Sequence, residues 1–225
     1  MTHLQEELKY LRETLSEMAK LVGSQLKKSF QALADDDQDL ANEVIFNEKR
    51  VNASELKIDK DCEHIFALLT PVAHDMRFVF ATLKINADLE RIGDYAEGIA
   101  KLSLQGELKF DKALMEKLKL KKMYDTAFEM MKDVTQAYCD DDTKMARTVF
   151  TKDIVLNDIN FFATDIVANY CKENLDKIHQ ALYLLSIVRK MERVGDHITN
   201  IAEEIIFYKE ARVLKHGKKK EDNEI

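Results

Sequence analysis

Helix-breaking residues are scarce in this sequence, which has one proline and six glycines among its 225 residues, and no tryptophan. Because proline and glycine disfavour the interior of α-helices, a chain almost without them is suited to long, uninterrupted helices. The hydrophobic fraction of 46% excludes an intrinsically disordered protein. A chain of this length can bury a substantial core, either as one domain or as two small ones.

Cysteines are few, and the 34 lysines and arginines are outnumbered by 41 aspartates and glutamates. The three cysteines, Cys62, Cys139 and Cys171, are widely spaced and form no Cys-x-x-Cys pair, which argues against a disulfide framework and a zinc knuckle. We expect reduced thiols, as in a cytosolic protein. The net charge of −7 argues against a nucleic-acid partner.

Long apolar runs are missing too. No uncharged apolar stretch reaches the roughly 20 residues that a membrane-spanning helix needs. The amino-terminal sequence MTHLQEELKY lacks the basic region and the apolar stretch of a secretion signal. We therefore expect a soluble, intracellular protein.

An internal repeat is the main feature that is present. The segment Asp88–Ala100, DLERIGDYAEGIA, returns 102 residues later as Lys190–Ala202, KMERVGDHITNIA. Six positions are identical, and they include a glutamate, an arginine, a glycine and an aspartate in the same order. A self-match over this distance predicts one structural unit of about a hundred residues that is used twice.

Apolar residues recur at helical spacing in both copies. The first seam, from Leu4 to Val22, advances by alternating steps of four and three residues, which is typical of a long amphipathic helix. The aspartates at positions 35–37 offer capping side chains for the next helix. After the first helix we expect five more, over residues 40–68, 71–104, 111–138, 143–171 and 174–214.

These helices predict an all-α fold made of two tandem three-helix bundles. We expect long antiparallel helices and a pseudo-twofold relation between the bundles. Residues 1–106 are assigned to the first bundle, residues 107–214 to the second, and residues 215–225 to a charged carboxy-terminal tail. Gly106 falls at the joint between the two halves.

Paired carboxylates give the repeat its chemistry. Glu90 and Asp94 are four residues apart, so they stack on one helix face, where they repel unless a cation, a proton or a basic side chain lies between them. The simplest alternative is an ion-pair network within the helix through Arg91. Gly93 and Gly195 each cost about 1 kcal/mol relative to alanine inside a helix, which points to close approach by a neighbouring helix or a bound group.

Further oxygen donors lie upstream in each copy. Glu48 and Asn52 are spaced by four residues in the first half, and the second half has the same spacing in Asp153 and Asn157. If the second and third helices of a bundle face each other, two such pairs can enclose a hard cation or a small cluster. Oxygen donors suit Mg²⁺, Ca²⁺, Mn²⁺ or ferric iron better than zinc, and asparagine in place of aspartate lowers the affinity.

The segments DLERIGDYAEGIAK and KMERVGDHITNIAE resemble the paired signatures of the PhoU family of bacterial phosphate-uptake regulators. Residues 48–55 fall where that family has its first acidic motif, and residues 71–77 are similar to the segment that leads into its third helix. Residues 153–157 correspond to the acidic motif in the second half. The resemblance covers nearly the whole chain.

The resemblance implies a cytoplasmic, non-catalytic helical protein that regulates phosphate uptake and phosphate homeostasis. Family members couple a phosphate ABC transporter, whose ATPase subunit is the expected contact, to a phosphate-sensing histidine kinase. They hold down the phosphate-starvation response when phosphate is plentiful. The resemblance also implies a homodimer that reaches the membrane only through its partners.

A metal centre is implied as well, because some members of the family carry iron clusters or other metal ions. We expect iron first, with zinc, manganese, magnesium or calcium as the alternatives. Glu55 and Asp75 are additional candidate ligands. The main ligands that the resemblance implies on this chain are Glu48, Asn52, Glu90, Asp94, Asp153, Asn157, Glu192 and Asp196.

Two other functions stay open. A related helical domain can serve a different, sodium-coupled phosphate carrier. A carboxylate-bridged di-metal enzyme is also a helical bundle with inward acids, but it characteristically uses Glu-x-x-His motifs. Since the sequence contains no such motif, we do not expect an enzyme.

Overall fold

Helices make up most of the computed structural model, which describes residues 2–105 and 110–212. Each half contributes three long helices, and the second half adds a short helix and a turn of 3₁₀-helix. The predicted all-α fold is confirmed. The elements are α1 (His3–Asp35), α2 (Gln38–Leu68), α3 (Ala73–Ser103), α4 (Lys112–Lys117), α5 (Leu120–Asp140), α6 (Thr143–Glu173), η1 (Leu175–Lys177) and α7 (Ile178–Glu210).

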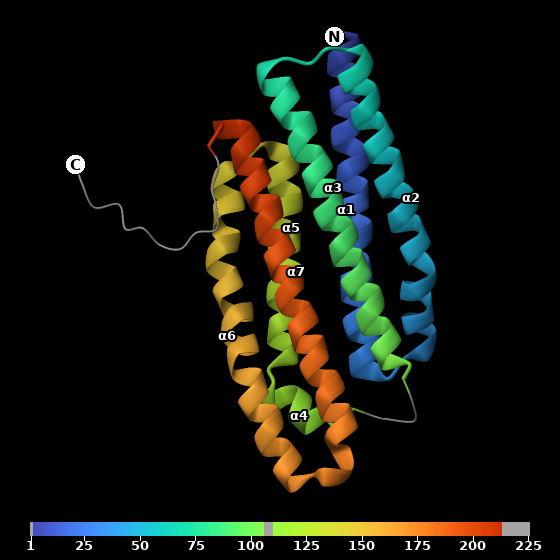
Figure 1. Cartoon of the computed structure of the whole chain (residues 1–225), viewed down its shortest axis with the longest axis vertical. Helices are drawn as coiled ribbons and strands as arrows, with labels where there is room; N and C mark the ends of the chain where they lie inside the picture. Colours follow the sequence, from blue (N-terminus) through green and yellow to red (C-terminus); the bar gives the residue numbers. More distant parts are fainter. Residues whose placement is uncertain (1, 106–109, 213–225) are drawn as a thin grey trace, which may run out of the picture.

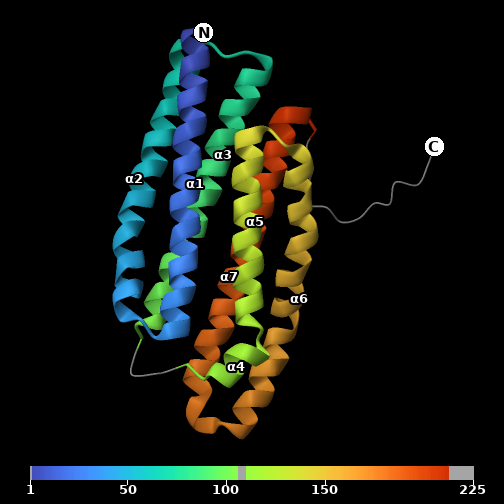
Figure 2. The same ribbon diagram turned by 180° about the vertical axis from the view of Figure 1, so that it is seen from behind.

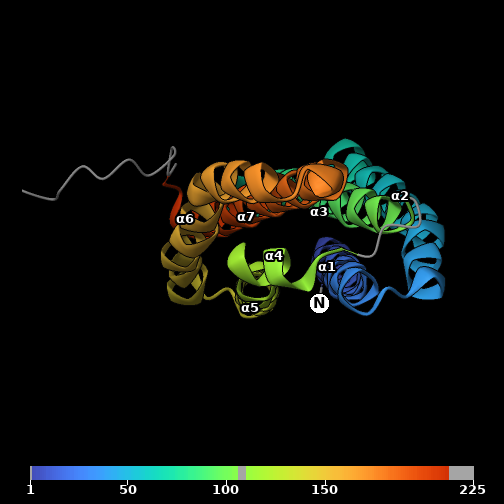
Figure 3. The ribbon, with the colours of Figure 1, turned by 90° about the horizontal axis from the view of Figure 1, so that it is seen from below.

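The six long helices form two three-helix bundles that pack against each other (Figure 1). α3 and α7 lie next to each other in the middle and run in opposite directions, with α2 and α6 at the outer edges. α1 and α5 lie behind them, as the reverse view shows (Figure 2). Seen from below, the α2–α3 and α6–α7 pairs follow one broad side of the molecule (Figure 3).

α1 forms as its apolar spacing predicts. Thr2 caps its first turn, because the Thr2 hydroxyl accepts from the backbone N–H of Gln5 while the Gln5 side chain accepts from the backbone N–H of Thr2. Leu11, Leu15 and Val22 of the predicted seam are at most 1% exposed. Burying each such side chain contributes about 1.5–3 kcal/mol, which holds the long helix against its neighbours.

Short connections join the helices of the first bundle. Asp36 ends α1 in the left-handed conformation, and Asp37 begins α2 by accepting a hydrogen bond from the N–H of Leu40. The predicted capping of the second helix by the run of aspartates is confirmed at Asp37. Pro71 lies just before α3 rather than inside it, since that helix begins at Ala73.

The helix expected over residues 111–138 is interrupted. α4 ends at Lys117, Lys119 takes a left-handed conformation with φ of 52°, and α5 begins at Leu120. Leu118 and Leu120 are both 1% exposed. In a continuous helix, side chains two residues apart point about 200° away from each other, so the interruption allows both leucines to reach the core.

The last helix differs slightly from its prediction over residues 174–214. It begins at Ile178, after the 3₁₀ turn, and ends at Glu210. The expectations for the joint at Gly106, for the end of this helix near Leu214 and for the charged tail fall on residues outside the described parts of the chain.

The main hydrophobic core runs through both bundles. Buried side chains of all six long helices belong to a single contact cluster, so the two halves fold against each other as one body. The contact between α3 and α7 follows the repeat. Oδ1 of Asp88 lies 2.7 Å from Nδ1 of His197. At the equivalent positions, Lys190 lies against Tyr95, with its Nζ 5.8 Å from the centre of the ring.

Candidate metal centres

Glu48 is the central side chain of the first site. It lies on α2 with 6% of its surface exposed, and neither carboxylate oxygen has a hydrogen-bond partner among the described residues. A Cβ on Gly93 of α3 would lie 3.2 Å from Oε2 of Glu48 and 3.1 Å from Cγ1 of Val51. The predicted close approach at this glycine is therefore confirmed, and the neighbour is the helix that carries Glu48.

Three acids of α3 face this buried carboxylate. Burial is the main cause that raises the pKa of Glu48 to about 7, and the three negative charges on α3 raise it further. Lys101 acts in the opposite direction, and it forms an ion pair of 2.6 Å with one of the three acids, Glu97. In order of their effect the acids are Asp94, Glu97 and Glu90. Three acids thus surround the two buried Glu48 oxygens, which lack a donor among the described residues.

Asp153 on α6 holds the corresponding position in the second half. Its Oδ1 is buried without a hydrogen-bond partner among the described residues, and its Oδ2 accepts a hydrogen bond of 2.7 Å from Nδ2 of Asn157. Burial is the main cause that raises the pKa of Asp153 to about 6. The Asn157 hydrogen bond lowers this pKa, whereas the charges of Asp196 and Glu192 raise it. A Cβ on Gly195 would lie 2.6 Å from Oδ1 of Asp153, so the close helix approach is repeated.

The arginine of each signature lies on the outer side of its helix. Arg91 binds Asp94 at 3.1 Å and Arg193 binds Asp196 at 3.0 Å, with about 60% of each arginine side chain exposed. The ion-pair network within the helix is therefore present. Exposed pairs of this kind contribute about 0–1 kcal/mol, and they leave Glu48 without a hydrogen-bond partner in the described parts of the chain.

The remaining candidates lie at different distances from the sites. Asn52 and Asn157 are exposed, and the amide group of Asn157 donates to Asp153. The pKa of Glu55 is raised, mainly by burial and then by the charges of Asp59 and Asp94. The effect of Asp94 places Glu55 near the first site. Asp75 is in the first turn of α3, about 28 Å along the helix from Asp94, so it does not join the first site.

Glu97 is a site residue that was not among the sequence candidates. It lies three residues after Asp94 and seven after Glu90, which places all three on one face of α3. This spacing was the signal that could have found it. The second half has Thr199 at the equivalent position, so the first site is the more acidic of the two.

The donor set fits a hard cation. Three of the buried oxygens, two on Glu48 and one on Asp153, lack a hydrogen-bond donor among the described residues, and a cation would satisfy them. Within residues 2–105 and 110–212, no three Asp, Glu, His or Cys side chains already form a group that could hold a metal ion. The carboxylates would therefore have to change rotamer to close around one.

The glycine contacts predict a graded effect on stability. Gly195→Ala is expected to lower the free energy of unfolding by about 1–3 kcal/mol, because its Cβ would meet Oδ1 of Asp153 at 2.6 Å. Gly93→Ala, with contacts of 3.1 and 3.2 Å, should cost less. Gly23→Ala is the control: its Cβ would make one ordinary contact of 3.6 Å, so alanine should stabilise α1 by about 1 kcal/mol. Urea unfolding measures all three, and equal effects would contradict the close approach at Gly195.

Fold and sites together define a duplicated all-helical protein with an acidic cluster between the second and third helices of each half. A family model described as the PhoU domain matches the chain twice, over residues 15–103 and 120–205. The chain belongs to the PhoU family. The predicted internal repeat and family resemblance are thereby confirmed.

Relatives and a solved structure agree with this assignment. The chain is 33% identical to a phosphate-specific transport system accessory protein PhoU homolog of Burkholderia sp, over 89% of this chain and 86% of that protein. It is 30% identical to the phosphate-specific transport system accessory protein PhoU of Escherichia coli, over 93% and 86% of the two chains. The crystal structure of PhoU from Pseudomonas aeruginosa is similar with a TM-score of 0.85 and 28% identity, and the match covers 93% of this chain and all of that one.

Family membership also bears on catalysis. The PhoU family consists of accessory and regulatory proteins, so the protein is not an enzyme. In the described parts of the chain, no helix combines the length and the apolar character that crossing a membrane requires.

Proposed function

We propose that this protein regulates phosphate uptake and phosphate homeostasis as an accessory protein of a phosphate transporter. The observation that carries the proposal is the double match to the PhoU domain, which covers most of the chain. The names of its relatives, which describe accessory proteins of a phosphate-specific transport system, support it.

Within this role, the protein couples a phosphate ABC transporter, through its ATPase subunit, to a phosphate-sensing histidine kinase. It represses the phosphate-starvation response while phosphate is plentiful. It acts in the cytoplasm as a homodimer and reaches the membrane through these partners. The absence of a membrane-spanning helix among the described residues is compatible with this arrangement.

We also propose that each half binds a cation between its second and third helices. Glu48 and Asp153 are the central donors, because each has a buried oxygen without a hydrogen-bond donor among the described residues. A bound cation would supply the positive charge that allows these buried carboxylates to ionise. The flanking donors are Glu90 and Asp94 in the first half, and Glu192 and Asp196 in the second.

The choice of metal follows from the oxygen donors. Carboxylates suit ferric iron, manganese, magnesium and calcium better than zinc, and iron is the first choice that the family resemblance implies. Whichever metal is bound, the residues of this chain have two roles. Without a cation, Glu48 holds a proton below pH about 7 and Asp153 below pH about 6. With a cation bound, the same residues connect α2 to α3, and α6 to α7.

Deleting the gene in its host is the test of the regulatory role. In phosphate-rich medium, the deletion strain should express phosphate-starvation genes at least tenfold more than the parent, because the repressing partner is lost. Restoring the wild-type gene should return expression to the parental level. Unchanged expression together with unchanged phosphate uptake would refute the proposed function.

The same strain separates the two transporter classes. If starvation genes stay low while sodium-dependent phosphate uptake changes, the protein serves a sodium-coupled carrier instead. Co-purification from host cells identifies the contact directly. The proposal expects the ATPase subunit of the ABC transporter and the histidine kinase to be recovered with the protein.

A further inference from the structure

A hollow of about 790 Å³ lies where α1 meets the break between α4 and α5. This volume falls in the range of about 300–1,000 Å³ that is usual for small-molecule sites. Its floor is apolar and is formed by Phe30, Ala34, Met115 and Leu120. None of the residues that line it belongs to the acidic sites on α2, α3, α6 and α7.

Positive charge is in excess around this hollow, although the protein as a whole has a net charge of −7. Four lysines and three acids line it. Two of the acids are already paired, since Asp125 binds Lys121 at 2.5 Å and Glu129 lies 3.3 Å from Lys152 of α6. Glu116 is the third acid. Three lysines of the lining form no ion pair with a described residue: Lys112, Lys119 and Lys122.

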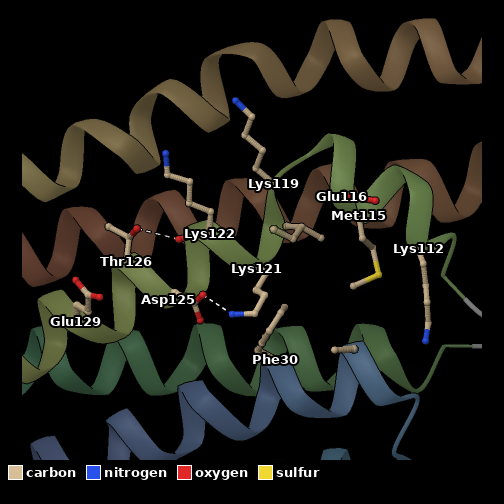
Figure 4. A pocket seen from close by; sticks show the side chains of 12 residues that line it. Phe30, Lys112, Met115, Glu116, Lys119, Lys121, Lys122, Asp125, Thr126 and Glu129 are labelled. Carbon is tan, nitrogen blue, oxygen red and sulfur yellow. Dashed lines mark hydrogen bonds and ion pairs between the residues drawn. The ribbon is translucent and has the colours of Figure 1, made fainter.

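Aromatic and charged side chains are combined in one place. In Figure 4, Phe30 and Met115 lie between Lys112 and Lys121. The Phe30 ring stacks on Tyr124 with a centroid distance of 4.4 Å, which fixes its orientation. An apolar face flanked by two ammonium groups suits a ligand that has both an apolar or aromatic body and a negative charge.

The start of α5 adds to the positive potential. Its N-cap residue is Lys119, and no side chain caps this end of the helix, so the positive end of the helix dipole stays available to an anion. Lys119 and Lys122 also line a second hollow, of about 200 Å³, on the side of α6. In Figure 4 both side chains point away from Phe30, so they add to the positive potential around the larger hollow without lying on its apolar face.

We propose that the larger hollow binds a soluble organic phosphate of nucleotide size. The aromatic or apolar body of the ligand packs on Phe30 and Met115, and its phosphate is bound by Lys112 and Lys121. Lys121 exchanges Asp125 for the phosphate, and this exchange costs little because both side chains of that pair are exposed. The concave shape favours a compact ligand over the flat surface of a bilayer. This inference goes beyond the proposed function, because it involves none of the acidic site residues.

Binding of ATP and AMP to the full chain, measured by isothermal titration calorimetry with a chelator and without divalent cations, tests the proposal. Two variants address the two halves of the site. Lys112→Gln with Lys121→Gln removes the charges. Ala34→Met fills the hollow without changing charge. Each variant is expected to weaken nucleotide binding at least tenfold, while circular dichroism confirms that the fold is kept.

The charge control is Lys20→Gln with Lys9→Gln. Lys20, like Lys112, is exposed and forms no ion pair with a described residue. Lys9, like Lys121, forms an i,i+4 ion pair, in this case with Glu13. Saturable ATP or AMP binding that survives in this control and is lost in both site variants supports the proposal. It is overturned if millimolar nucleotide does not bind, if inorganic phosphate binds as tightly as ATP, or if Ala34→Met leaves binding unchanged. Binding only to vesicles that contain anionic lipid, with free nucleotide inactive, overturns it as well.

Discussion

Glu48→Gln is expected to stabilise the metal-free protein at pH 8 by about 1–2 kcal/mol. At this pH the Glu48 carboxyl, whose pKa is raised to about 7, carries a buried negative charge beside three other acids. Glutamine has the same shape without that charge, and its amide can donate to a neighbouring carboxylate. Urea unfolding in the presence of a chelator measures the effect.

The same variant should also change how the stability of the protein depends on pH. The pKa of Glu48 is higher in the folded protein, about 7, than its ordinary value of 4.5. The folded state therefore binds more protons between these values, so the free energy of unfolding falls as pH rises through this window. Glu48→Gln should remove part of that fall. The raised pKa values of Asp153, Glu90, Glu192 and Glu55 act in the same direction.

Glu63→Gln is the matched control, because it removes the same charge from an exposed position on the same helix. It should leave both the stability at pH 8 and the pH dependence close to wild type. If Glu48→Gln is less stable than wild type at pH 8, or keeps the full fall with pH, the buried carboxylate is not the strained group that its surroundings indicate.

Glu90→Ala with Asp94→Ala is expected to weaken cation binding in the first half at least tenfold and to lower the metal content of the purified protein by at least half. Both carboxylates face Glu48, and removing them leaves Glu97 as the only acid of α3 that faces it. Alanine is favourable in a helix, so the fold should be kept. Glu192→Ala with Asp196→Ala should do the same in the second half.

The two double variants should differ in degree. The first site has four acids, whereas the second has three acids and a carboxylate that already accepts a hydrogen bond from Asn157. Wild type should therefore bind its first cation mainly at Glu48. Glu13→Ala with Glu17→Ala, an exposed pair with the same i,i+4 spacing on α1, serves as the control and should leave metal content unchanged. Equal metal content in all these variants would contradict the assignment of the sites.

Much of this architecture could be predicted from the sequence, because its signals are periodic. The seam from Leu4 to Val22 and the repeated signature were enough to predict long helices in two equivalent bundles. The glycines of the signature also predicted a close helix approach, since a glycine inside a helix carries a cost that packing must offset. Contacts of Gly93 with Glu48, and of Gly195 with Asp153, agree with that prediction.

The break at Lys119 could not be predicted in the same way. Leu114 and Leu118 are four residues apart, as on one face of a continuous helix, and neither glycine nor proline marks the interruption. The tertiary structure decides it, because burying both Leu118 and Leu120 needs a change of helix direction. A local sequence pattern contains no information about that packing.

Part of the candidate site was hidden for a related reason. Spacing by four identifies Glu90 with Asp94, but Glu97 joins them through positions three and seven residues away. Whether such a residue faces Glu48 or the solvent depends on where α2 lies against α3. The exposed positions of Asn52 and Asn157 depend on the same packing.

The central claim is that each half holds a cation between its second and third helices. Crystals soaked in manganese, with anomalous differences measured at the manganese edge, test it most directly. The claim predicts two peaks in equivalent places, one beside Glu48, Glu90 and Asp94 and the other beside Asp153, Glu192 and Asp196, with the first peak the stronger. An anomalous map without peaks at these carboxylates, or with peaks only elsewhere on the molecule, would contradict it.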